Sequence, residues 1–142
     1  MASNSPKVLL YDLETSHNIV AQFDPADQYT PHTNLLVERF IISVSWKWLG
    51  EKTVYAVSIL DNPKRFAKDH YDDYHVVSEF LKVAEEADVV VGHNIDQFDA
   101  RFLNGRALAH GLDPLPPLTS VDTLKIAKLK FRLNYNKLDY LA

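Results

Sequence analysis

The chain has 142 residues, of which 46% are hydrophobic, and this is enough apolar material for one globular domain with a buried core. Its formal net charge of −4 excludes nucleic-acid binding through overall basicity, and the absence of cysteine excludes disulfides and thiolate metal sites. There is neither an apolar run long enough to span a membrane nor an apolar N-terminal core typical of a secretion signal. We therefore expect a single cytoplasmic domain over residues 1–142 with no membrane partner.

The first half of the chain is predicted to contain three strands that form an antiparallel meander. Each strand-like run is rich in β-branched and aromatic residues and is bounded by turn-forming residues. The predicted strands cover residues 8–13, 40–49 and 53–60, with Gly50 in the hairpin turn between the last two. We expect an exposed loop over 23–34 and an irregular polar segment over 61–73.

The second half alternates helical and strand-like patterns. A helix is predicted over 76–87, and the uniformly apolar segment 88–91 is typical of a strand in a parallel pairing. A second helix is expected over 97–110, with Gly111 as its C-cap. Its inward-facing residues are expected to be Phe98, Phe102, Leu103 and Leu108. With a strand and helix over 121–129, this order predicts an α/β fold, in which helices pack against a mixed sheet.

Two carboxylates end the first predicted strand. Asp12 and Glu14 are separated by one residue, so an extended backbone directs both side chains to the same face of the sheet. Two adjacent carboxylates resist ionising together unless a cation lies between them. The pair therefore predicts a site for a hard divalent cation.

A second candidate segment, "VVVGHNIDQFDARFL", joins the apolar strand to the following helix over 89–103. Asp96 and Asp99 are three positions apart, so they are expected to share one helical face. The helix dipole explains Asp96 without a functional role, which leaves Asp99 as the stronger candidate. Asn94 is a candidate for substrate contact because its amide both donates and accepts hydrogen bonds, and His93 is expected to be structural.

These two segments carry a family resemblance. "YDLET" followed by "GHNIDQFDARFL" resembles the first two motifs of the DnaQ-like, or DEDD, 3′–5′ exonucleases. The spacing of Asn94, Phe98 and Asp99 looks most like that in exonuclease domains of family B DNA polymerases and their phage relatives. The segment "SVDTLKIAK" is also similar to the region after the second motif. The resemblance implies an RNase H-like fold, a mixed five-stranded sheet flanked by helices.

The resemblance also implies roles for individual residues. Asp12, Glu14 and Asp99 would be the catalytic residues and the ligands of two Mg²⁺ or Mn²⁺ ions. The substrate would be a DNA single strand or 3′ end, and the products would be 5′-mononucleotides. From the residues themselves, Thr15 and Asn94 are candidates for contact with this substrate, and a plain strand-exit hydroxyl is the equal alternative for Thr15. The implied partner is a polymerase or replication complex, in the host cytoplasm if the chain is phage-encoded.

The family requires a third motif that supplies one more carboxylate. Tyr135 and Asp139 match the motif Tyr-x-x-x-Asp. Only 40 positions separate Asp99 from Asp139, however, whereas the family uses a longer interval. We expect the true third motif to lie beyond Ala142, so that this domain is incomplete at its C-terminus. The polypeptide alone is then expected to have little or no activity, with Tyr135 and Asp139 as the alternative.

Two other functions are compatible with the same residues. One is an exoribonuclease with an identical site, and the other is a non-catalytic RNase H-like module that binds nucleic acid or a protein. The segment 124–138 has five basic residues and no acid, which indicates either a solvated helix face or a surface that contacts phosphates. Asp122, two residues before this segment, is expected to be a helix N-cap.

Overall fold

The computed structural model describes residues 5–26 and 29–142. The strands are β1 (Val8–Thr15), β2 (Ile19–Val20), β3 (Leu35–Val37), β4 (Ile41–Trp48), β5 (Tyr55–Ser58), β6 (Val89–Gly92) and β7 (Thr119–Asp122). The helices are α1 (Pro63–Lys68), α2 (Tyr74–Ala84), α3 (Asp99–Ala109), α4 (Thr123–Lys130) and α5 (Leu138–Leu141), with 3-10 turns η1 (His32–Asn34) and η2 (Ile59–Asp61).

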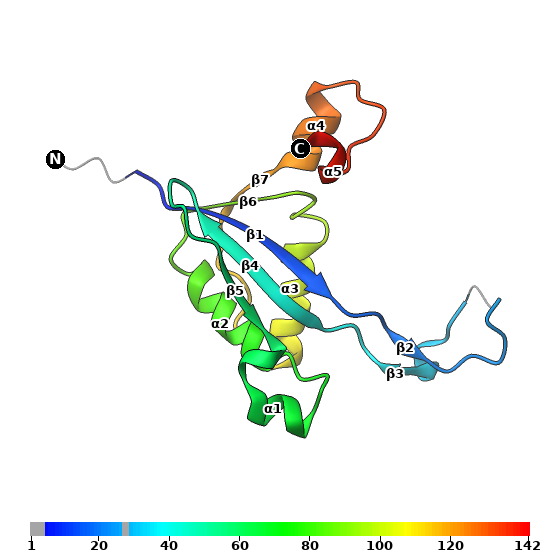
Figure 1. The fold of residues 1–142 in the computed structure, drawn as a ribbon. Helices are drawn as coiled ribbons and strands as arrows, with labels where there is room; N and C mark the ends of the chain where they lie inside the picture. The colour runs from blue at the N-terminus through cyan, green and yellow to red at the C-terminus, as the bar shows by residue number, and fades with distance from the viewer. Residues whose placement is uncertain (1–4, 27–28) are drawn as a thin grey trace.

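Five strands form one mixed sheet in the order β5-β4-β1-β6-β7 (Figure 1). β1 pairs antiparallel with β4, which pairs antiparallel with β5, so the predicted meander is confirmed. β6 pairs parallel with both β1 and β7, as its uniformly apolar sequence predicted. The expected α/β architecture of a mixed five-stranded sheet with flanking helices is therefore observed.

The hydrophobic core lies on the face of the sheet that α2 and α3 cover (Figure 1). Along β1, Leu9, Tyr11 and Leu13 are buried, whereas the residues between them point to the opposite face. Phe80 of α2 is fully buried, and its ring lies 4.8 Å from that of Tyr11. Strand alternation thus places an apolar face against the helices and leaves the other face for polar residues.

β6 ends in a sharp turn that leads into α3. A Cβ atom at Gly92 would lie 2.8 Å from Cδ1 of Ile95, which is buried, so the turn requires glycine at this position. Asn94 has a φ of 65°, in the left-handed region that asparagine tolerates better than most residues. The turn sets where α3 begins and therefore where its first side chain points.

Two expectations for helices were wrong. The segment 61–73 contains a short helix, α1, because the Asn62 side chain accepts a hydrogen bond from the backbone N–H of Arg65 and Pro63 occupies the first turn. Leu108 does not face inward but is 80% exposed, because the buried face of α3 consists of Asp99, Leu103 and Ala107.

A two-stranded ribbon, β2–β3, projects beyond the end of β1 (Figure 1). It was not predicted, because its strands are only two and three residues long. The loop expected over 23–34 contains η1 near its end, and positions 27 and 28 of that loop lie outside the described residues. None of the helices in the described part of the chain is long and apolar enough to cross a membrane.

Candidate active site

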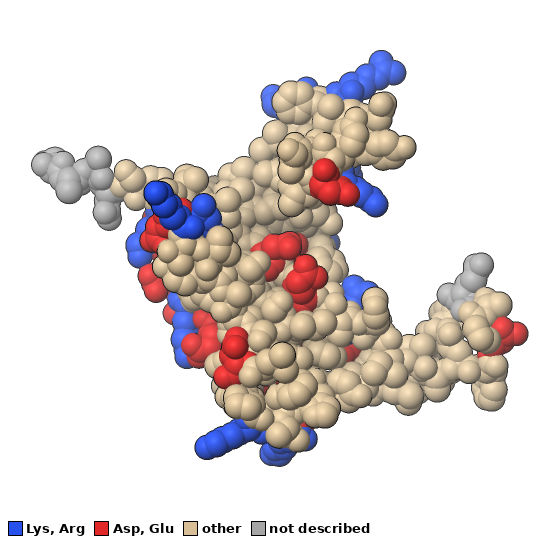
Figure 2. Space-filling model, viewed as in Figure 1, with Lys and Arg blue, Asp and Glu red and all other residues tan. Residues whose placement is uncertain are grey.

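The two carboxylates of β1 lie on the open face of the sheet. Asp12 and Glu14 are both exposed, and they pair across the ladder with Ser45 and Ser43 of β4. The small hydroxyl side chains opposite leave space above the acids. Figure 2 shows acidic atoms on this face of the sheet, below the segment that carries α4 and α5. The expected projection of both carboxylates to one side of β1 is observed.

Asp99 reaches β1 from the start of α3. Its Oδ1 accepts a hydrogen bond of 3.0 Å from the backbone N–H of Leu13, a residue 86 positions away that lies between Asp12 and Glu14. The last pair between β1 and β6 joins Leu10 to Val91, so β1 continues beyond its parallel partner. Beyond Leu10 this edge of β1 has no strand partner among the described residues, and the Asp99 carboxylate binds there instead. It therefore lies beside the part of β1 that carries Asp12 and Glu14.

The surroundings of Asp99 do not stabilise its charge. The residue is 4% exposed, and burial is the main cause that raises its pKa to about 6. The nearby charges of Asp12 and Asp122 raise this pKa further, and only backbone hydrogen bonds oppose them. No basic side chain forms an ion pair with Asp99 within residues 5–26 and 29–142. A bound cation would relieve this unfavourable environment.

A second buried aspartate shows the contrasting arrangement. Asp73 is fully buried, but its carboxylate accepts hydrogen bonds from Arg106 through two atoms at 2.8 Å and from the backbone N–H of Ile41 at 2.7 Å. His110 lies 2.6 Å away. Burial would raise the pKa of Asp73, but Arg106 and His110 outweigh it and lower this pKa. Asp73 is therefore a structural link, whereas Asp99 has no such partners.

Asp96 does not share a helical face with Asp99, contrary to expectation. It lies in the turn before α3, and its carboxylate forms an ion pair of 2.6 Å with Lys125 of α4. The hydrogen bond from Lys125 lowers the pKa of Asp96, so its charge is already balanced. The helix-spacing argument failed because α3 begins three residues later than Asp96.

Asp122 is the residue whose role sequence reasoning most underestimated. It is the expected N-cap of α4, and it accepts from the backbone N–H groups of Leu124 at 2.9 Å and Lys125 at 3.4 Å. It also accepts from the backbone N–H groups of Asn94 at 2.9 Å and Asp96 at 3.3 Å. One buried carboxylate thus joins α4 to the turn that positions Asp99, and only the parallel β6–β7 pairing brings them together.

The expected substrate-contacting residues flank the acids. Thr15 is half-buried and follows a register shift in the β1–β4 ladder, and such an irregularity re-aims the side chains at a strand end. Asn94 lines a cavity of about 510 Å³ together with Lys128 and Tyr135. Thr15 is thus next to Glu14 in the chain, whereas the cavity at Asn94 is lined by none of the three carboxylates.

A contact with His93 holds the segment after α4, and with it α5, near the open face of the sheet that carries Asp12 and Glu14. Both ring nitrogens of His93 have partners, Thr123 at 2.9 Å and the carbonyl of Asn136 at 2.8 Å, so His93 is structural as expected. Leu138 of α5 lines the same cavity of about 320 Å³ as Asp12. The basic run is largely exposed along this segment.

Tyr135 and Asp139 do not join the acidic group. Tyr135 is 63% exposed and packs edge-on against Tyr140, and Asp139 is exposed on α5. Among the described residues, no three His, Asp or Glu side chains are close enough to hold a metal ion together. The carboxylates of β1 and α3 are neighbours, but a complete metal cage is not formed by this part of the chain.

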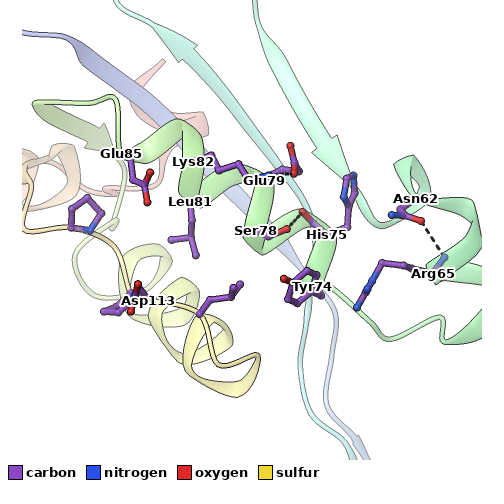
Figure 3. A pocket seen from close by; sticks show the side chains of 13 residues that line it. Asn62, Arg65, Tyr74, His75, Ser78, Glu79, Leu81, Lys82, Glu85 and Asp113 are labelled. Atoms are coloured by element: carbon purple, nitrogen blue, oxygen red, sulfur yellow. Dashed lines mark hydrogen bonds and ion pairs between the residues drawn. The ribbon is translucent and has the colours of Figure 1, made fainter.

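A further pocket lies on the helical side of the sheet, away from the acids. Its volume is about 430 Å³, and α2 forms one wall (Figure 3). Several of its polar groups have partners within the protein: Ser78 donates to the carbonyl of His75, and Arg65 lies over the ring of Tyr74 and pairs with Asp72. None of the carboxylates Asp12, Glu14 and Asp99 lines this pocket.

The fold and the β1–α3 acidic site together define an RNase H-like domain of the exonuclease type. The family model for the exonuclease domain of DNA polymerase family B matches residues 3–139, so the chain belongs to this family. The structure is similar to the family B DNA polymerase from the hyperthermophilic archaeon Pyrobaculum calidifontis, with a TM-score of 0.63 and 18% sequence identity over 97% of this chain. The chain spans 18% of the length of that polymerase. No curated protein matches significantly.

Proposed function

We propose that this exonuclease domain hydrolyses the phosphodiester bonds of DNA from the 3′ end, with the help of divalent cations, and releases 5′-mononucleotides. The observation that carries the proposal is the contact between Asp99 and the backbone of β1 between Asp12 and Glu14. Membership of the polymerase exonuclease family supports the direction of the reaction and a nucleic-acid substrate. By the same argument we place the domain beside a polymerase module.

By their donor chemistry the three carboxylates suit Mg²⁺ or Mn²⁺, although the described part of the chain does not bring three such side chains close enough to bind one ion together. Asp12, Glu14 and Asp99 offer only oxygen donors, and none of them has an ion-pair partner in the described part of the chain. Hard cations prefer such donors. When bound, two such ions activate a water molecule and stabilise the leaving 3′ oxygen. The protein's part is to hold the carboxylates in place, and Asp122 positions the turn that presents Asp99.

The substrate would be held by groups at the two ends of the acidic face. Asn94 can donate and accept hydrogen bonds with a nucleotide, while its backbone N–H is held by Asp122. Thr15 can offer its hydroxyl where β1 ends. These groups would position the terminal nucleotide over Asp12 and Glu14.

Calorimetry with Mn²⁺ tests the proposal without requiring turnover. Wild-type protein should bind Mn²⁺, and both Asp12→Ala and Asp99→Asn should weaken binding by at least about tenfold. Asp139→Asn, on the exposed part of α5, is the matched control and should leave binding unchanged. Absence of Mn²⁺ binding to the wild type would instead favour a non-catalytic module.

Matched 5′-labelled DNA and RNA strands separate the two enzymatic alternatives. We expect weak laddering from the 3′ end of DNA, because Tyr135 and Asp139 are not assembled with the acids. Preferential degradation of RNA would identify an exoribonuclease. Robust laddering of DNA that Asp139→Ala abolishes would show that Asp139 supplies the third motif.

A further inference from the structure

A groove lined by three arginines lies beside α3, beyond the end of β1. Its volume is about 480 Å³, and it separates one side of α3 from the loops that join β1 to β2 and β3 to β4. We call it the arginine groove, and its polar and aromatic lining consists of Asn18, Glu38, Arg39, Arg101, Phe102 and Arg106. None of these side chains belongs to the acidic site.

Two of the three arginines have no ion-pair partner among the described residues. Arg106 is balanced by the fully buried Asp73. Glu38 is 3.8 Å from Arg106 but is 70% exposed, so solvent screens its charge. Neither Arg39 nor Arg101 forms an ion pair with any residue in the ranges 5–26 and 29–142. The positive charge of the groove is therefore only partly balanced, since Asp96, whose pKa is lowered by Lys125 and also by the Arg101 charge, is already paired with Lys125.

Arg39 also has a donor without an acceptor. Its Nε is buried and has no hydrogen-bond partner, whereas its backbone N–H donates to the Asn18 side chain at 2.7 Å. Buried polar atoms nearly always have partners, but this Nε is covered and cannot itself meet a ligand in the groove, so only the terminal nitrogens of Arg39 are candidates for a phosphate contact. Guanidinium groups match phosphate oxygens in geometry and in charge.

The groove and the acidic site both draw residues from α3, although no residue lines both. Arg101 is two residues and Arg106 seven residues beyond Asp99, which places them about 3 Å and about 10 Å further along the helix axis at about 1.5 Å per residue. Phe102 stacks on Phe98 between the two regions, with ring centroids 5.7 Å apart.

We propose that the arginine groove binds backbone phosphates of the nucleic-acid strand whose 3′ end lies at Asp12, Glu14 and Asp99. This inference rests on the proposed exonuclease function. Arg39 and Arg101 supply the charge, and the Phe98–Phe102 pair forms an apolar wall between the groove and the acids. The groove would contact the strand a few nucleotides before the scissile bond and would act on any base sequence, because phosphates carry no sequence information.

Fluorescence anisotropy with a labelled oligothymidylate of about twelve nucleotides tests the inference, with Ca²⁺ in place of Mg²⁺ to limit cleavage. Arg101→Gln and Arg39→Gln should each weaken binding about fivefold and reduce the magnitude of the salt slope by about 0.7, the value of one single-strand phosphate contact. Lys64→Gln removes a positive charge from exposed α1 and is the matched control, with no expected change.

The outcomes separate the groove from the active site. If both arginine variants bind the oligonucleotide like Lys64→Gln, the groove does not contact the strand, and the proposal is overturned while Mn²⁺ binding still supports the exonuclease. If all three variants weaken binding equally, the effect is non-specific charge and the groove is again excluded. If the wild type binds neither Mn²⁺ nor the oligonucleotide, the proposed function fails and the groove proposal fails with it. Because Arg101 is exposed, Arg101→Gln is expected to fold, and this variant alone decides the outcome if Arg39→Gln does not fold.

Discussion

Replacing Asp99 with asparagine is expected to stabilise the metal-free protein at neutral pH while it weakens metal binding. The side chain is buried, its pKa is raised to about 6, and its hydrogen-bond donor is a backbone amide rather than a cation. Asparagine keeps nearly the same shape and can still accept the hydrogen bond from Leu13. It removes only the charge that burial opposes.

The size of the effect follows from the pKa difference. Between a reference of 3.8 and a folded value of about 6 lie about two pKa units, and at about 1.36 kcal/mol per unit this amounts to about 3 kcal/mol. The neutral amide accepts a weaker hydrogen bond than a carboxylate, which costs about 1 kcal/mol. The expected net gain is about 2 kcal/mol, or about 5 °C in Tm for a chain of this length.

The sign of the pH dependence is also determined. Because the folded-state pKa of Asp99 is raised, the native protein binds more protons than the unfolded chain between about pH 4 and pH 6. Wild-type stability should therefore fall across this window as pH rises, relative to Asp99→Asn. Below pH 4 Asp99 is protonated in both states, so its contribution vanishes there.

Urea unfolding in EDTA, at about pH 7.5 and about pH 4, measures this difference. Asp73→Asn is the control with the opposite sign, because Arg106, His110 and Ile41 stabilise its charge and lower its pKa. That variant should be less stable than the wild type at pH 7.5 by about 3 kcal/mol or more. A loss of stability at pH 7.5 in Asp99→Asn like that in Asp73→Asn would refute the argument that the Asp99 charge is unfavourable without a cation.

Three further predictions concern the same region. Mn²⁺ affinity should fall steeply below about pH 6, because a proton on Asp99 competes with the metal. A Mn²⁺ affinity that does not change between about pH 5 and about pH 8 would exclude Asp99 as a ligand. Thermal unfolding should show that Gly92→Ala destabilises the protein by about 1–3 kcal/mol, because the new Cβ atom would collide with Ile95. Gly105→Ala is the control: its Cβ atom would have no neighbour within 4 Å, so this variant should be neutral or slightly stabilising. Asp122→Ala should destabilise the protein by about 2 kcal/mol or more, because four backbone N–H groups lose their acceptor. It should also weaken Mn²⁺ binding, because two of these groups belong to the turn that positions Asp99. An unchanged Mn²⁺ affinity would limit Asp122 to a capping role.

Much of the fold could be predicted from local patterns. The i, i+2 geometry of a strand placed Asp12 and Glu14 on one face of β1, because strand geometry depends only on the backbone, whereas the alternation that buries Leu9, Tyr11 and Leu13 was not predicted. The uniformly apolar sequence of β6 indicated its parallel pairing. The helix α1 was missed because its start depends on one side-chain cap, at Asn62, within a segment without apolar periodicity.

The sequence by itself determined which chemistry is present: an acidic pair at the end of β1 and an aspartate after Phe98 in the motif of a known exonuclease family. Only the tertiary structure supplied the physical reason for that choice over Asp96, because a lysine from α4 neutralises Asp96, whereas Asp99 is buried beside Leu13 without an ion-pair partner among the described residues. The same is true of the arginine groove, where Arg39 and Arg101 lie 62 positions apart in the chain. Burial and charge pairing depend on contacts between distant segments, and local sequence patterns contain no information about which segments will meet.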